Sequence, residues 1–445
     1  MRFHRVTLGV LFLLPSLFSA LKAQDFSTYF LDKTLRLDFV FAGNSAEQHI
    51  FYAGAKKYEG WAGRRGHLSD ILLRGNGQLL VRDHTSQQLI YTHTFSTLFQ
   101  EWVATEEATR SSQSFEATFQ IPFPKEPVDI TVSLLDIHGK EKTTYSQTID
   151  PSDILIRPVE SRKLLSNQLL RQGSVQECVD VVIISEGYKE DEYVKFSKDA
   201  ERACEALFAH EPFKSLRTRF NIQAVFAPSQ DSGPSIPHDN IWHETACQSH
   251  FDTFYTDRYL TTSSLFQLHD LLAGLPYEHI IVLANTGTYG GGGIYNQLTL
   301  TTSDHRTFSQ VLVHEFGHAY AGLADEYFYD DQFSSIYPAD TEPWEPNLTT
   351  LVDFKSKWAD LLSEATPVPT PPSDIPDYRT AKTKKEWKAI NESVHRIGVF
   401  EGGGYQSKGV FRPAQECRMK INEVTDFCPV CTRAIRRVTD FYTEK

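Results

Sequence analysis

The sequence predicts an all-β sandwich domain over residues 24–155, followed by a domain of the α/β (α+β) class over residues 156–445. Three observations support this division. A chain of 445 residues is too long for one ordinary hydrophobic core. Alternating apolar and polar residues fill the first part, whereas continuous apolar runs and amphipathic helices fill the second. Between them, residues 150–161 are polar and carry Pro151 and Pro158, which is typical of a linker.

Period-2 alternation in the first part predicts antiparallel strands with turn residues between them. Four such runs cover residues 35–41, 78–82, 115–121 and 128–134. A sandwich of this size is common among all-β domains. This part contains no constellation of catalytic residues, so we interpret it as a packing or substrate-presenting module.

The second part predicts a mostly parallel sheet. Strands are expected at residues 179–185, 221–226, 279–284 and 298–300, with a helix at residues 190–209 between the first two. A strand, a helix and a strand in succession indicate parallel pairing with a crossover helix. Residues 330–385 are rich in Pro, Asp and Ser, which predicts a long surface insertion.

Residues 1–23 have the pattern of a secretory signal peptide. Arg2 and Arg5 precede a short apolar run from Val6 to Leu21, and the small Ala23 stands at the expected cleavage position. The run is short for a membrane span, and no second long apolar stretch follows. We therefore expect an exported protein, periplasmic, at the cell surface or secreted, with no stable membrane span.

Composition excludes several functional classes. The chain has 44 Lys and Arg against 57 Asp and Glu, a net charge of -13, which gives it no reason to bind nucleic acid. It has neither a Gly-x-Ser-x-Gly elbow nor a phosphate-binding glycine motif, so serine hydrolases and nucleotide enzymes have no support. We expect a monomer.

The chemistry is predicted from a His-Glu-x-x-His motif at residues 314–318. Residues 308–321 have helical character, which places His314 and His318 on one face, one turn apart. Two imidazoles so placed can bind one Zn²⁺ ion. Glu315 adjoins the first histidine and is positioned to take a proton from a water molecule on that ion.

A catalytic zinc site needs a third protein ligand. Gly322 can end the helix by adopting a positive φ, and Asp325 and Glu326 follow it. We favour Asp325 by analogy with the short return after the glycine in extended zinc motifs. The acid that is not a ligand is then expected to orient a histidine ring.

The extended motif resembles that of the metzincins, in which a glycine turn and a third ligand follow the two histidines. Metzincins also carry a methionine turn beneath the zinc, and Met419 is the only methionine left once the signal peptide is removed. Here the glycine and the acid come one residue later than in the common pattern. Ala324 therefore occupies the position of the usual ligand.

After about residue 165 the chain also resembles the bacterial immunoglobulin-A-type metallopeptidases. The resemblance lies in residues 184–188, 257–260, 289–293, 314–318, 322–327, 400–405 and 427–431. It implies a zincin/metzincin-like catalytic domain, commonly preceded by a β-rich domain, and a zinc peptidase. It does not imply that immunoglobulin A is the substrate.

Two glycine-rich segments are candidates for substrate binding. Tyr289, Gly290, Gly291 and Gly292 lie between two predicted strands, where an edge strand can pair with an extended peptide. A flexible loop or a bulge is an equal alternative. Tyr405, at the end of the second glycine-rich segment, is a candidate donor to a developing oxyanion.

All six cysteines lie in the second part of the chain. For Cys417, Cys428 and Cys431 we expect a disulfide from Cys417 to one of the other two, since export permits disulfides. A structural zinc is the alternative, but the sequence offers no evident fourth ligand.

These observations predict a secreted zinc metalloendopeptidase that binds one catalytic Zn²⁺ ion and hydrolyses a protein or peptide substrate. One alternative is a surface-binding protein that keeps a peptidase fold without turnover. Another is a zinc exopeptidase or a peptidoglycan hydrolase.

Overall fold

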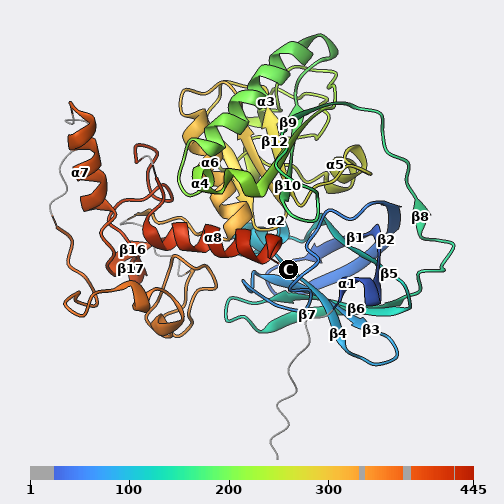
Figure 1. Cartoon of the computed structure of the whole chain (residues 1–445), viewed down its shortest axis with the longest axis horizontal. Coiled ribbons are helices and arrows are strands. Elements are labelled where there is room, and N and C mark those ends of the chain that lie inside the picture. The colour runs from blue at the N-terminus through green and yellow to red at the C-terminus, as the bar shows by residue number, and fades with distance from the viewer. Residues whose placement is uncertain (1–24, 330–335, 374–381, 425, 445) are drawn as a thin grey trace, which may run out of the picture.

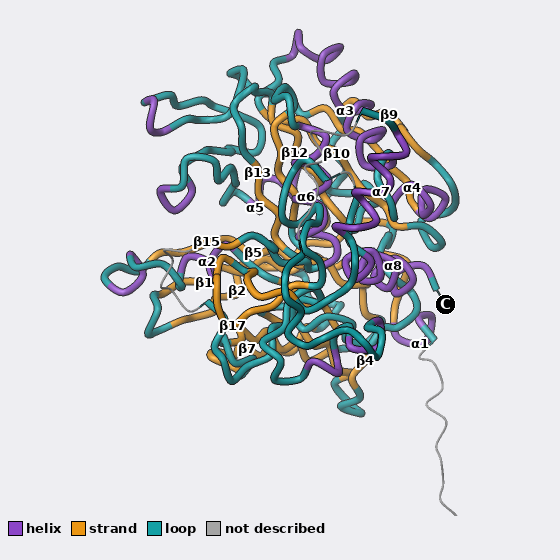
Figure 2. Tube along the Cα trace, turned by 90° about the vertical axis from the view of Figure 1, so that its left-hand side faces the viewer, coloured by secondary structure: helices purple, strands orange, loops and turns teal. Residues whose placement is uncertain are grey.

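The computed structural model describes residues 25–329, 336–373, 382–424 and 426–444 (Figure 1). The predicted signal peptide and parts of the predicted insertion lie outside these ranges. Within them, none of the helices combines the length and the apolar character needed to cross a membrane. Figures 1 and 2 both place the mixed sheet of the second half above the two sheets of the first half.

The first half consists of two four-stranded sheets, with strand orders β5-β1-β2-β8 and β4-β3-β6-β7. The strands are β1 (Phe30–Gly43), β2 (Gln48–Glu59), β3 (Gly77–Asp83), β4 (Leu89–Phe95), β5 (Gln113–Pro124), β6 (Val128–Leu135), β7 (Glu141–Ile149) and β8 (Arg157–Pro158). Two short helices, α1 (Phe26–Tyr29) and α2 (Leu98–Trp102), accompany them. The four predicted runs fall within β1, β3, β5 and β6. Their inward-facing residues form one aromatic-rich core.

The stretch that we predicted to be a linker contains strand β8. Lys56 and Lys57 of β2 pair in parallel with Arg157 and Pro158. Part of this polar segment is therefore held against the first sheet. Pro158 is tolerated there because β8 is an edge strand, where a residue without an amide hydrogen costs no ladder bond.

The second half is built on a six-stranded sheet of order β13-β14-β12-β10-β11-β9. The four inner strands, β14 (Leu298–Thr302), β12 (His279–Ala284), β10 (Val179–Glu186) and β11 (Phe220–Phe226), are parallel. These four strands contain the four predicted runs. The outer strands β13 (Gly291–Ile294) and β9 (Leu165–Leu170) are antiparallel to their neighbours.

Helices cover both faces of this sheet. On one face, Val181 and Ile183 share a core with α3 (Tyr193–Phe208), α6 (Phe308–Ala321) and α8 (Pro429–Thr443). On the other face, the alternate residues of β10 pack against α5 (Leu265–Leu271). Among the described residues, the second half also contains the α-helices α4 (Phe213–Leu216) and α7 (Lys384–Val394). A mixed fold with helices on both faces agrees with the predicted α/β (α+β) class.

A small third sheet completes the second half. Strands β15 (Phe328–Tyr329), β17 (Tyr405–Arg412) and β16 (Phe400–Gly403) lie in that order, with β15 parallel to β17. The pairing of β15 with β17 brings the chain just after α6 against the second glycine-rich segment. Residues 325–329 and 403–406 thus meet beside the metal motif.

The two halves contact each other through buried polar groups. The Arg36 side chain is fully buried and pairs with Asp38 at 2.7 Å and with Asp270, from the second half, at 2.6 Å. The Ser96 amide donates to the Tyr295 carbonyl at 3.0 Å, one residue beyond β13. Buried charges stay paired because an unpaired one is costly. This interface places the first half next to the candidate site.

Candidate metal centre and active site

Helix α6 carries the motif and covers the predicted residues 308–321. It ends at Gly322, whose φ of 57° lies in the left-handed region. The Gly322 amide donates to the His318 carbonyl at 3.0 Å, and the Leu323 amide donates to the Gly317 carbonyl at 3.3 Å. A Cβ at Gly322 would approach the ring of Trp344 to 2.6 Å, so both backbone angle and space favour glycine. This turn brings Asp325 back over the helix.

Three potential ligand atoms converge at this turn. The Nε2 atoms of His314 and His318 lie 3.0 Å apart. The Oδ1 atom of Asp325 lies 3.0 Å from the first and 3.3 Å from the second. The three residues are thus within reach of one metal ion. Glu326, the other candidate acid, does not join this group or orient either ring.

Backbone carbonyls fix the orientation of both histidines. Nδ1 of His314 donates to the Arg418 carbonyl at 3.0 Å, and Nδ1 of His318 donates to the Leu323 carbonyl at 2.6 Å. With Nδ1 protonated, both Nε2 atoms carry lone pairs and face the Asp325 carboxylate. Groups that all accept hydrogen bonds repel one another, and a divalent cation between them removes this conflict. The donor set therefore fits a metal ion, and two imidazoles with one carboxylate suit Zn²⁺.

Asp325 is held from its other side. The Tyr405 hydroxyl donates to Asp325 Oδ2, and the Gly404 amide donates to the Asp325 carbonyl at 2.8 Å. Burial acts to raise the pKa of Asp325, but histidines that carry a proton on Nε2 hold it well below its usual value. The carboxylate is therefore ionised and fixed in direction. We predicted Tyr405 as an oxyanion donor, whereas its hydroxyl here binds the candidate ligand.

The side chain of Glu315, a residue of α6, lies against the glycine-rich strand β13. A Cβ at Gly291 would lie 2.9 Å from Glu315 Cγ and 3.1 Å from its Oε1. The Glu315 carboxyl is partly buried, and burial raises its pKa, while His314 and His318 oppose the rise. A carboxyl group beside a metal site can receive a proton from a water molecule and return it.

Two family models match the chain. The IgA Peptidase M64 model covers residues 168–439, more than half of the sequence, and the Peptidase M64 N-terminus model covers residues 25–146. The chain belongs to the IgA peptidase M64 family. Membership makes it a peptidase that acts on proteins or peptides, in a family that is generally metal-dependent. No curated protein matches the sequence.

In this M64 peptidase, strand β13 is an outer strand of the sheet, and its outer edge is bonded at Gly291. The Gly291 amide donates to the Arg258 carbonyl at 3.3 Å, and its carbonyl accepts from the Leu260 amide at 3.4 Å. The outer edge is thus already paired at Gly291. Tyr289 is partly exposed, and its ring lies 5.1 Å from that of His305. The glycines here allow β13 to pack closely on α6. A run of glycines in a sequence is compatible both with such packing and with a substrate-binding edge, so the sequence alone does not distinguish the two.

Met419 lies beneath α6 and is fully buried. Its Sδ would be 3.0 Å from a Cβ at Gly317, which stands between the two histidines. Its carbonyl accepts from the Glu326 amide at 2.8 Å. The preceding residue, Arg418, holds the ring of His314. The methionine segment thus supports the floor of the site, the place where we predicted a Met-turn.

Two further residues near the site could not be found from local sequence patterns. Glu101, in α2 of the first half, interacts electrostatically with His318 and accepts a hydrogen bond from the Tyr259 hydroxyl. Burial raises its pKa to about 7. Asn347 is fully buried and bonds the Ala324 amide at 2.8 Å and the Ala324 carbonyl at 2.9 Å. Both residues reach the site through tertiary packing from distant parts of the chain.

The predicted disulfide is not formed. All six cysteines are free thiols, and the Sγ atoms of Cys417 and Cys431 lie 3.8 Å apart, whereas a disulfide bond is about 2.05 Å long. Cys428 belongs to the same cluster, and the fourth member is Glu326. The cysteines are close together as predicted, but they surround a carboxylate that the sequence did not connect with them.

Proposed function

We propose that this chain is an exported zinc metalloendopeptidase whose metal is held by His314, His318 and Asp325. The observation that carries the proposal is the convergence of two imidazole Nε2 atoms and one carboxylate oxygen within 3.0–3.3 Å of one another. Glu315 stands directly beside this group. A protein that only binds its target has no need for a glutamate in that position.

When bound, the zinc ion supplies Lewis acidity, which polarises the substrate carbonyl and lowers the pKa of water. Glu315 takes a proton from the water molecule that attacks the peptide carbonyl. It then returns this proton to the departing amine nitrogen. The position of Glu315 beside the three ligands suits both transfers, because its carboxylate accepts the proton and its carboxylic acid then donates it.

The surrounding residues keep these groups in place. The Arg418 and Leu323 carbonyls orient the two imidazoles, and Tyr405 orients Asp325. Such outer contacts typically change metal affinity or activity by about 10–100-fold when removed. Strand β13 packs against the Glu315 side chain at Gly291, which limits the positions that the carboxylate can adopt.

The test is cleavage of a mixed peptide library by the full-length chain, the Glu315→Gln variant and the Glu205→Gln variant. Glu205 is an exposed glutamate on α3 that pairs with Arg217, far from the motif in sequence, so it controls for loss of a carboxylate. We expect equal zinc content in all three proteins and cleavage by all except Glu315→Gln. Cleavage by Glu315→Gln at the wild-type rate would refute the assigned role. Products cut within chains, instead of at termini, distinguish an endopeptidase from an exopeptidase.

A further inference from the structure

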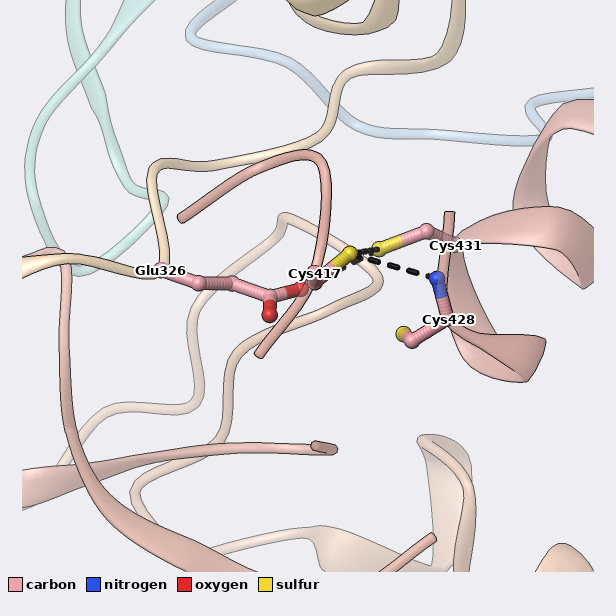
Figure 3. A group of neighbouring side chains, drawn as sticks. All are labelled: Glu326, Cys417, Cys428 and Cys431. Carbon is pink, nitrogen blue, oxygen red and sulfur yellow. Dashed lines mark hydrogen bonds between the residues drawn. The ribbon is translucent and has the colours of Figure 1, made fainter. Parts of the chain in front are cut away.

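A second cluster of potential metal ligands lies outside the motif. It comprises Glu326, Cys417, Cys428 and Cys431, each contributing one ligand atom, with all four atoms within 4.8 Å of one another. All four residues are fully buried. Figure 3 shows their side chains pointing toward one another from three separate segments of the chain. Four converging sulfur and oxygen atoms match the ligand number of a structural zinc site.

The spacing of the ligand atoms agrees with a tetrahedral site. In a tetrahedral site, thiolate sulfur atoms about 2.3 Å from one zinc ion lie about 3.8 Å apart. The Sγ atoms of Cys417 and Cys431 are 3.8 Å apart, and Glu326 Oε1 lies 3.1 Å from Cys431 Sγ. The Cys428 amide also donates to Cys417 Sγ at 3.2 Å, a contact that stabilises a thiolate.

In the part of the chain that the structure describes, the Glu326 carboxylate has one oxygen with hydrogen-bond partners and one without. Glu326 Oε1 accepts from the Asn347 amide at 3.0 Å, whereas Oε2 is buried without a hydrogen-bond partner among the described residues. Leaving a buried carboxylate oxygen unsatisfied is costly, and a metal ion or a proton is needed to offset that cost.

Two buried arginines balance the charge of the cluster. A zinc ion with three thiolates and one carboxylate has a net charge of -2. The guanidinium of Arg412 interacts electrostatically with Glu326, and that of Arg418 interacts with Cys417. Both arginines are buried, and their guanidinium groups donate to backbone carbonyls. Each also interacts with carboxylates outside the cluster, Arg412 with Glu416 and Arg418 with Asp426 and Glu423, so the cluster shares these positive charges.

We propose that Cys417, Cys428, Cys431 and Glu326 bind a second, structural zinc ion. Cys428 and Cys431 have the C-x₂-C spacing of a zinc half-site and stand at the start of α8. Cys417 comes from the methionine segment, and Glu326 from the chain that leaves α6. The site is separate from the proposed catalytic centre and does not depend on the peptidase mechanism.

This second site would fix the floor of the catalytic centre. Glu326 is the residue after Asp325, and its amide bonds the Met419 carbonyl. Cys417 precedes Arg418, whose carbonyl holds His314. Three supports of the catalytic centre are thus within two residues of a ligand in the second site. Loss of the structural ion would loosen these supports and lower the thermal stability of the whole domain.

The test begins with zinc analysis of the full-length chain, purified without chelators, beside three variants. We expect about two zinc ions in wild type and about one in His318→Ala and in Cys428→Ser, as each site holds one ion. Cys204→Ser is the matched control, since Cys204 is a buried thiol of α3 outside the cluster, and it should retain both ions. Cys428→Ser should also unfold at a lower temperature than Cys204→Ser.

A measurement on wild type alone covers the case in which Cys428→Ser does not fold. A mercurial reagent that titrates the thiols should release one zinc ion to a chromogenic chelator as the three cluster thiols react. Cobalt substitution should give a sulfur-to-cobalt charge-transfer band that persists in His318→Ala. A single zinc ion in wild type that Cys428→Ser retains and His318→Ala loses would overturn the proposal and leave the catalytic centre unaffected. A mass spectrum with Cys417 disulfide-bonded to Cys428 or Cys431 would overturn it as well.

Discussion

The substitution Gly293→Ala should lower both stability and activity, although β13 carries no catalytic group. A Cβ at Gly293 would lie 2.2 Å from the Glu315 carbonyl oxygen, 3.0 Å from the Glu315 carbonyl carbon and 2.9 Å from His318 Cβ. The first two atoms belong to the backbone of α6, so no change of rotamer can move them away. A carbon at 2.2 Å is more than about 1 Å inside normal contact, so β13 and α6 must separate.

The size of the effect follows from this displacement. Overpacking of a buried contact costs about 1–3 kcal/mol. At roughly 2–4 °C per kcal/mol for domains of 150–250 residues, the melting temperature should fall by several degrees. A shift of about 1 Å between catalytic groups can lower the rate by about 100-fold. We therefore expect a modest loss of stability and a much larger loss of kcat/KM.

The assay is thermal unfolding together with cleavage of one peptide identified in the library. Gly287→Ala is the matched control, because a Cβ there meets no atom within 4 Å among the described residues. It should behave as wild type. If Gly293→Ala matches Gly287→Ala in both stability and kcat/KM, the inference that β13 packs on α6 too closely for a Cβ at position 293 is wrong.

Three further predictions concern supporting residues. Tyr405→Phe removes the donor to Asp325, so zinc affinity should fall by about 10–100-fold in a chelator competition; reduced kcat with unchanged affinity would instead favour an oxyanion role. Asn347→Ala leaves both backbone groups of Ala324 unpaired, and should lower the free energy of unfolding in urea by about 1–3 kcal/mol per buried group; an unchanged midpoint would contradict this. Burial raises the pKa of Asp180 from 3.8 to about 6. Its folded form therefore binds the proton more tightly than the unfolded form, and the stabilising effect of that proton is lost as the pH rises through this window. Asp180→Asn should accordingly gain melting temperature relative to wild type between pH 4 and pH 7, whereas a constant difference would refute the shift.

Local patterns predicted the parts of the site that depend on one helix and one turn. The spacing of His314 and His318 follows from the helical period, and Gly322 marks the turn that returns Asp325. Both are properties of a short segment, so no knowledge of the remaining fold was needed. The four inner strands of the second sheet were likewise evident as apolar runs.

Tertiary packing determined what the sequence could not show. Glu101 approaches His318 only because the first half docks beside β13, and Asn347 reaches Ala324 from a long irregular segment. The outer edge of β13 is covered by residues 258–260, which no local pattern predicts. Glu326 joins the cysteine cluster through long-range packing, since its amide bonds the carbonyl of Met419, two residues beyond Cys417. The free thiols of the structure differ from the predicted disulfide, because spacing indicates that cysteines are close but does not define what they bind.

The most direct test of the central claim is a zinc-edge anomalous difference map from crystals of the full-length chain. The account predicts a peak about 2.0–2.2 Å from Nε2 of His314, Nε2 of His318 and a carboxylate oxygen of Asp325. Glu315 should stand beside this peak without being a ligand. A map with no peak there, in crystals of protein that cleaves peptides, would contradict the assignment of these three residues as the ligands of the catalytic metal.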